Sequence, residues 1–183
     1  YGAELINNSS PFADAEIIEL SYRILASLEI PDLKLEINSV GCSDCRDDYK
    51  AALVEHLKKH EAQLCPDCIS RMERNPLRTL DCKIPSCQEV MASAPSILDY
   101  QCDACRTHFD AVQHALADIN ISFDINPKLV RGLDYYTRTT FEIKYAGLGA
   151  QDALLGGGRY DGLVEELGGK RTECIGFAGG YER

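Results

Sequence analysis

The sequence predicts an α+β fold in which a mostly helical, cysteine-rich block interrupts a sheet. Apolar residues recur at helical spacing between Ile17 and Leu28 near the start of the chain. The middle of the chain contains four pairs of cysteines among helical patterns and prolines. After Ser122 the pattern changes to short runs that are typical of strands. We divide the chain into residues 1–41, 42–105 and 106–183.

The first part is expected to contain a strand, a helix and a second strand. Glu4 lies in a short apolar stretch, AELI, at the end of the first strand. Serine at a cap and proline in the first turn favour a helix that begins at Ser9-Ser10-Pro11, and Pro31 is expected to end it. The second strand is indicated by the alternation of Leu33, Leu35 and Ile37.

The middle part is expected to be mostly helical. A long helix is predicted from Arg46 to about Leu64, and short helices and turns are predicted for residues 69–98, which contain three prolines. The pair Cys102 and Cys105 opens another helix. One face of that helix is apolar: Phe109, Val112, Leu116 and Ile119.

The last part is expected to be rich in strands. Asp161 to Leu167 is predicted to be a short helix that Gly168-Gly169 stops. The predicted strands are Phe123 to Ile125, a run from Leu129 onward, Thr139 to Lys144, Ala153 to Leu155, and Ile175 to Ala178.

Length and charge limit the classes of protein to be considered. A chain of 183 residues fits one domain, or one domain with an insertion. No apolar run reaches the roughly 18 residues of a membrane span, and the start does not resemble a secretory signal. The net charge of −10 alone argues against a nucleic-acid binder. Tyr1 begins in the middle of a pattern, so we expect a fragment of a longer protein.

Two stretches have the composition of a ligand site: LVRGLDYYTRTTFE (residues 129–142) and GGGRYDG (residues 156–162). Glycines allow a backbone to approach a ligand closely, and arginine and tyrosine beside them suit a small polar ligand that carries an anion. If Tyr135 and Tyr136 lie on a strand, their side chains point to opposite sides. The alternatives are a salt-bridged Arg131, tyrosines that only pack, and an ordinary glycine turn.

These stretches also resemble a known family. RGLDYYTRTTFE and GGGRYDGLVEELGG resemble the two histidine-specific motifs of histidyl-tRNA synthetases, and GFAGGYER resembles the third motif of class II aminoacyl-tRNA synthetases. The opening, YGAELINNSSPFADAEIIEL, resembles the end of the second motif. The resemblance implies the antiparallel class II sheet, interrupted by an insertion. It also implies a cytoplasmic, homodimeric ligase that uses ATP with Mg to activate histidine and charge tRNA(His).

The resemblance implies roles for single residues. Arg131 would be the catalytic cation that meets the α-phosphate of ATP, and Arg183 would bind the adenine and γ-phosphate. Glu4 would receive the α-ammonium of histidine. The remaining residues of the histidine pocket would be Tyr136 and Tyr160 on the imidazole, Tyr135 in support, and the backbone of Gly156, Gly157 and Gly158.

Eight of the nine cysteines form pairs, which in a chain without an export signal favours metal over disulfides. A helix between Cys45 and Cys65 would separate those two pairs by ~28 Å. We therefore expect an inner zinc site of Cys65, Cys68, Cys82 and Cys87, and an outer site of Cys42, Cys45, Cys102 and Cys105. The number of zinc ions stays open at this stage, with two, one and none as the alternatives. Cys174 is expected to lie in the core, and all four histidines on the surface or in packing, with a histidine ligand for zinc as the alternative.

Three basic residues of the insertion, Arg71, Arg74 and Arg78, are expected to contact the tRNA backbone unless they pair with local acids such as Glu73. The isolated chain is expected to be inactive. Two other functions stay open. One is the synthetase-like, non-catalytic regulatory subunit of ATP phosphoribosyltransferase, although that protein would not be expected to carry the insertion. The other is a zinc-ribbon-like protein that binds RNA without catalysis.

Overall fold

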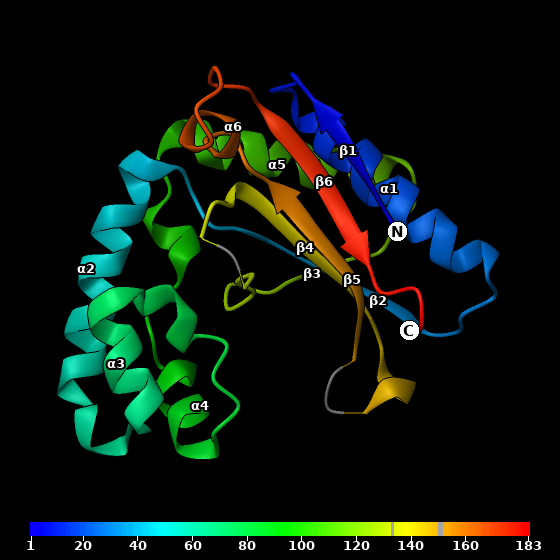
Figure 1. Ribbon diagram of the computed structural model, residues 1–183. Coiled ribbons are helices and arrows are strands. Elements are labelled where there is room, and N and C mark those ends of the chain that lie inside the picture. Colours follow the sequence, from blue (N-terminus) through cyan, green and yellow to red (C-terminus); the bar gives the residue numbers. More distant parts are fainter. Residues whose placement is uncertain (133, 150–151) are drawn as a thin grey trace.

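The computed structural model describes residues 1–132, 134–149 and 152–183 and confirms the α+β fold. A six-stranded sheet has the order β1-β6-β5-β4-β2-β3, and helices α1 and α5 cover one of its faces (Figure 1). All neighbouring strands are antiparallel except β2 and β3, which form a short parallel pair. The strands are β1 (Gly2–Ile6), β2 (Leu33–Ser39), β3 (Asp124–Ile125), β4 (Thr137–Tyr145), β5 (Ala153–Arg159) and β6 (Cys174–Gly179).

The two covering helices form the main core with the sheet. Helix α1 (Pro11–Ser27) begins as expected, because the Ser10 side chain accepts a hydrogen bond from the Phe12 N–H. It ends four residues before Pro31, since the chain enters the left-handed region at Glu29 (φ 57°). Helix α5 spans Asp103–Asp118. The core between these helices and the sheet includes Ile17, Ile18, Leu25, Val112, Leu116, Phe141, Ile143 and Phe177.

Residues 43–100 form a separate helical lobe beside the sheet (Figure 1). It contains α2 (Ser43–Lys59), α3 (Pro66–Arg74) and α4 (Pro85–Ala92), joined by the 3-10 turns η1 (Glu61–Gln63), η2 (Pro76–Thr79) and η3 (Ile97–Tyr100). The predicted helix from Arg46 to Leu64 therefore starts earlier, at Ser43, and ends at Lys59. The lobe has its own core, in which Tyr49, Leu53, Leu57 and Met91 are buried. None of the helices in the described ranges is long and apolar enough to cross a membrane.

The chain between Leu129 and β4 differs from the prediction. Residues 129–132 and 134–136 are not a strand, so the expected strand from Leu129 onward is wrong for these residues, and Leu133 lies outside the described ones. Helix α6 covers only Leu163–Glu166, and η4 covers Ala146–Leu148. The glycine stop is confirmed: Gly168 has a φ of 90°, and the N–H groups of Gly168 and Gly169 bond the carbonyls of Glu165 and Val164.

Candidate functional site

Three glycines in neighbouring strands leave one patch of the sheet without side chains. Glu4 in β1 is paired with Gly176 in β6, and Gly176 is paired with Gly158 in β5. A Cβ at Gly176 would touch the Glu4 carboxylate, and one at Gly158 would lie 2.8 Å from Cδ1 of Tyr136. At Gly156 it would lie 2.5 Å from Cζ of Arg131. The sheet therefore offers a bare floor on the face that carries Glu4, Arg131 and Tyr136.

The neighbouring Gly157 points the other way. A Cβ there would lie 2.8 Å from Cβ of Phe177 and 2.9 Å from Cε1 of Phe141, both of which belong to the core. The backbone of Gly156, Gly157 and Gly158 was predicted to form part of the histidine pocket, whereas Gly176 was not predicted. Gly176 lies in the GFAGGYER motif, and only the register of β1, β6 and β5 reveals that it belongs to the same floor.

Three tyrosines gather above this floor. Tyr135 and Tyr136 have ring centroids 4.7 Å apart, and Tyr135 lies 5.8 Å from Tyr160 in an edge-on contact. Tyr135 and Tyr136 both precede β4, so the condition of the expectation, that they lie on a strand, is not met and the alternation of a strand does not apply. We call the described residues 131–132 and 134–136 the tyrosine loop.

The hydroxyl groups of two tyrosines remain proton donors at neutral pH. Burial, reinforced by Tyr135, raises the pKa of Tyr136 to about 12. Burial and the Glu4 carboxylate also raise the pKa of Tyr160, whose hydroxyl donates a hydrogen bond to Oε2 of Glu4. The site thus combines one carboxylate with phenol donors, a set that can bind an ammonium group and a ring nitrogen.

Arg131 supplies a cation at the edge of the floor. Its Nη1 forms an ion pair with Glu142, and Lys144 lies 3.5 Å from the other oxygen of Glu142. The salt-bridged alternative thus describes Arg131 in this structure. Its Nε is buried and has no hydrogen-bond partner among the described residues, so a donor remains for an incoming anion. The side chain of Arg183 reaches the start of β5, where its Nη1 donates a hydrogen bond to the carbonyl of Ala153 at 2.7 Å.

Eight cysteines gather in the two predicted sets of four. The sulfur atoms of each set all lie within 4.8 Å of one another. Sulfur pairs are 3.7 Å apart for Cys42–Cys45, 3.8 Å for Cys45–Cys105 and 3.9 Å for Cys65–Cys82. A tetrahedron of thiolates at about 2.3 Å from zinc has edges of about 3.8 Å. All nine cysteines are free thiols, and neither set includes a histidine.

The positions of the cysteines on helices explain why the pairs converge. Cys42, Cys65 and Cys102 are the N-caps of α2, α3 and α5, and the second cysteine of each pair is the third helical residue. Helix N-termini stabilise thiolates. The N–H of Cys68 and the surrounding thiols lower the pKa of Cys65 to about 7. Burial raises the pKa of Cys42, but the N–H groups of Cys45 and Asp44 outweigh it and lower the value to about 7.

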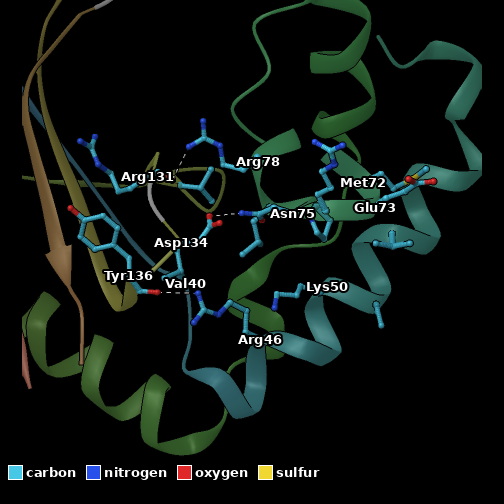
Figure 2. A pocket seen from close by; sticks show the side chains of 16 residues that line it. Val40, Arg46, Lys50, Met72, Glu73, Asn75, Arg78, Arg131, Asp134 and Tyr136 are labelled. Atoms are coloured by element: carbon cyan, nitrogen blue, oxygen red, sulfur yellow. Dashed lines mark hydrogen bonds between the residues drawn. The ribbon is translucent and has the colours of Figure 1, made fainter. Parts of the chain in front are cut away.

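A basic cavity of about 540 Å³ separates the helical lobe from the tyrosine loop (Figure 2). Two acids, Glu73 and Asp134, line it together with five cations: Arg46, Lys50, Arg74, Arg78 and Arg131. The lining is therefore cationic in a chain with a net charge of −10. Arg46 and Lys50 were not predicted as site residues, although their spacing of four places them on one side of a helix.

Two of the three arginines expected to bind RNA line this cavity. Arg74 and Arg78 do so, whereas Arg71 donates from Nη1 to the carbonyl of Arg78 at 3.3 Å. The alternative, pairing with Glu73, is not seen among the ion pairs of the described residues.

A buried polar network lies on the other face of the sheet. Arg159 is fully buried and donates to Asp14, to Asp161 at 3.1 Å and to the carbonyl of Asn8 at 2.9 Å. His108 lies 2.7 Å from the second oxygen of Asp14. Burial raises the pKa of Asp14, but the hydrogen bonds from His108 and Arg159 outweigh it and hold the pKa below its usual value. His108 is thus buried in a polar network, and Cys174 lies in the core region as expected.

Comparison with known proteins covers the whole chain. Residues 1–183 match the family described as Histidyl-tRNA synthetase. A histidine–tRNA ligase of Halothermothrix orenii is 51% identical over 182 residues, which are 100% of this chain and 43% of that protein. The structure of apo S. aureus histidyl-tRNA synthetase has a TM-score of 0.77 at 37% identity, covering 100% of this chain and 44% of that one. The chain thus spans less than half the length of these relatives.

A fourth comparison shows likeness of fold alone. A structure described as an ATP phosphoribosyltransferase regulatory subunit/histidyl-tRNA synthetase from Bacillus halodurans C has a TM-score of 0.61 at 23% identity. It covers 96% of this chain and 49% of that one.

Proposed function

Because this chain belongs to the histidyl-tRNA synthetase family, we propose that it supplies the amino-acid pocket of a longer histidine–tRNA ligase. That enzyme joins histidine to ATP, with Mg, as histidyl-adenylate and then transfers the histidyl group to tRNA(His). The observation that carries the proposal is the bare floor of Gly156, Gly158 and Gly176 beneath Glu4, the tyrosines and Arg131. The homodimer of the parent enzyme is part of the proposal and rests on family membership.

In the proposed pocket the α-ammonium of histidine binds Glu4 and displaces the Tyr160 hydroxyl that now occupies it. The freed hydroxyl and that of Tyr136 then bond the imidazole nitrogens, while Tyr135 packs against both rings. Discrimination follows because an analogue without these nitrogens leaves buried hydroxyls unpaired. The backbone of Gly157 and Gly158 forms the adjacent wall.

In the activation step a carboxylate oxygen of histidine attacks the α-phosphorus of ATP, and the bond to pyrophosphate breaks. Negative charge grows on the α-phosphate oxygens. Arg131 meets that charge, exchanging part of its pairing with Glu142 for the phosphate. Arg183 binds the adenine and γ-phosphate. Both assignments rest on the position of these residues in the family motifs and on the free donor at Nε of Arg131.

The two cysteine clusters fit structural zinc, one ion in each, because both offer four thiols at tetrahedral spacing with the second cysteine of each pair buried. When bound, zinc supplies no chemistry to the ligase reaction and only stabilises the lobe. We propose residues 42–105 as an insertion whose two ends are joined by the outer cluster. The spatial closeness of Cys42 and Cys102, at 3.9 Å, supports this division.

The lobe is further proposed to contact the tRNA backbone through Arg71, Arg74 and Arg78. The cationic lining of the cavity supports this contact. Replacing all three by alanine should weaken RNA binding. The slope of log affinity against log salt concentration should also become shallower by the amount expected for about three lost phosphate contacts. A Lys58→Ala/Lys59→Ala variant, altered at the exposed end of α2, is the matched control. Unchanged affinity and salt slope in the triple variant would remove the contact.

The proposal is tested by histidine-dependent exchange between ATP and pyrophosphate. The full-length protein should catalyse this exchange and charge tRNA(His), whereas this chain alone should not, because partial sets of catalytic residues lose most of their effect. A regulatory subunit would bind histidine without exchange or charging. Identity near 50% to histidine–tRNA ligases favours the enzyme.

A further inference from the structure

Three side chains of the helical lobe donate hydrogen bonds to the tyrosine loop (Figure 2). Nη1 of Arg46 donates to the carbonyl of Tyr136 at 3.0 Å. The amide of Asn75 donates to the carboxylate of Asp134. Nη1 of Arg78 donates to the carbonyl of Arg131 at 3.4 Å. The loop is thus held at both ends and in between by residues that are more than 50 positions away in the sequence.

Each donor lies in a segment that a cysteine cluster holds at one or both ends. Arg46 directly follows Cys45 in the first turn of α2, so the outer cluster fixes the position of its backbone. Asn75 and Arg78 lie between Cys68 and Cys82, which the inner cluster brings together. Their side chains project from these anchored segments into the cavity.

A backbone contact adds to this connection on the outer side. The N–H of Arg138 donates to the carbonyl of Gly41 at 2.8 Å, and the N–H of Val40 donates to the carbonyl of Arg138 at 2.7 Å. Gly41 has a φ of 70°, and a Cβ there would lie 2.8 Å from Sγ of Cys45. The residues that enter the outer cluster are therefore paired with the chain that leaves the tyrosine loop.

From these contacts we infer that the helical lobe positions the tyrosine loop, with Arg46, Asn75 and Arg78 as positioning residues that the cysteine clusters hold in place. The lobe would thus fix the position of residues in the amino-acid pocket, in addition to its proposed contact with RNA. The effect on histidine binding rests on the proposed function, whereas the effect on the loop does not.

The test compares Arg46→Ala with Arg46→Lys and with the matched control Lys50→Ala. Lys50 lies one turn further on the same helix and lines the same cavity, but among the described residues its ammonium pairs only with the exposed Asp47, at 3.2 Å. Amide hydrogen exchange is read at Arg138 and Val40 and, as a check of folding, at the buried Leu53 of α2.

Arg46→Ala should speed exchange at Arg138 and Val40 about tenfold, since a hydrogen bond from a charged donor is lost. Arg46→Lys should restore most of the protection, because an ammonium can donate to the same carbonyl. Lys50→Ala should leave exchange unchanged, and Leu53 should stay protected in all variants. Chelation of metal should speed exchange at Arg138 without any substitution. Equal exchange in Arg46→Ala and Lys50→Ala would overturn the inference.

A histidine titration followed by NMR separates this inference from the proposed function. If the unaltered chain binds histidine, Arg46→Ala should weaken binding about tenfold and Lys50→Ala should not. If the unaltered chain and the full-length protein both fail to bind histidine, the proposed pocket is wrong, while the exchange data still decide whether the lobe holds the loop.

Discussion

Replacement of Cys68 by serine is the most direct test of the inner cluster. Cys68 is completely buried in the core of the helical lobe, where its thiol faces Cys65, Cys82 and Cys87. Serine has nearly the same volume but does not provide a thiolate, so the change removes a ligand with little loss of packing. The inner cluster should then fail to retain zinc, because a structural site needs four ligands.

The size of the effect follows from the linkage between binding and folding. Zinc at about a thousand times its dissociation constant stabilises the folded state by about 4 kcal/mol. For a chain of this length, 1 kcal/mol corresponds to a shift of about 2–4 °C in the melting temperature. Cys68→Ser should therefore melt about 8–16 °C below the unaltered chain in zinc-containing buffer. The difference should shrink when a chelator removes zinc from both proteins.

The assay combines metal analysis with thermal unfolding, and Cys174→Ser is the control. Cys174 is equally buried but lies in β6, and its thiol donates to the carbonyl of Thr172, outside both clusters. We expect about two zinc ions in the unaltered chain and in Cys174→Ser, and about one in Cys68→Ser. A chain purified with free thiols and no zinc, or equal melting of the two variants in zinc, would refute the reasoning.

Three other predictions concern the pocket and the core. Gly158→Ala should abolish histidine binding in an NMR titration, since its Cβ would lie 2.6 Å from the Thr139 carbonyl, whereas Gly162→Ala, with its nearest atom at 3.8 Å, should bind normally. Asp14→Asn should lower the free energy of unfolding in urea at pH 7 by about 3–5 kcal/mol, because the buried guanidinium of Arg159 loses its Asp14 carboxylate and keeps Asp161 as its acidic partner. Because the pKa of Asp14 is held below its usual value, this loss should shrink as the pH falls below 3.8 through the folded pKa of Asp14, and a loss independent of pH would contradict the prediction. Arg131→Ala in the full-length protein should reduce exchange between ATP and pyrophosphate at least 100-fold with little change in histidine affinity, and equal losses in both would contradict a role in the transition state.

Local chemistry is what the sequence predicted best. The N-cap of α1, the glycine stop after α6 and the strand at Leu33–Ser39 depend on neighbouring residues, and all three are found. The grouping of the cysteines also followed from distance, because the helix of residues 43–59 keeps Cys45 and Cys65 apart. Each of these features can be derived from one segment and a simple geometric rule.

Features that depend on pairing between distant segments could not be predicted. Gly176 joins the floor only because β6 pairs with β5 in one particular register. The alternation of Tyr135 and Tyr136 was expected only on a strand, and the strand begins only at Thr137, although nothing in the composition of the preceding residues excludes one. Arg46 was named only as the start of a predicted helix, because its contact with the Tyr136 carbonyl joins segments that lie 90 positions apart.

One arginine, Arg78, belongs to both proposed roles of the lobe, and this has a thermodynamic consequence. Arg78 donates to the carbonyl of Arg131 in the tyrosine loop and is also one of the three arginines proposed to contact the RNA backbone. A phosphate that takes the guanidinium donors of Arg78 competes with the loop for them. RNA and histidine binding should therefore be coupled, and because coupling free energy is reciprocal, histidine must change the affinity for RNA by the same factor. Two sites that shared no residue and no connecting element would show a factor of one in both directions.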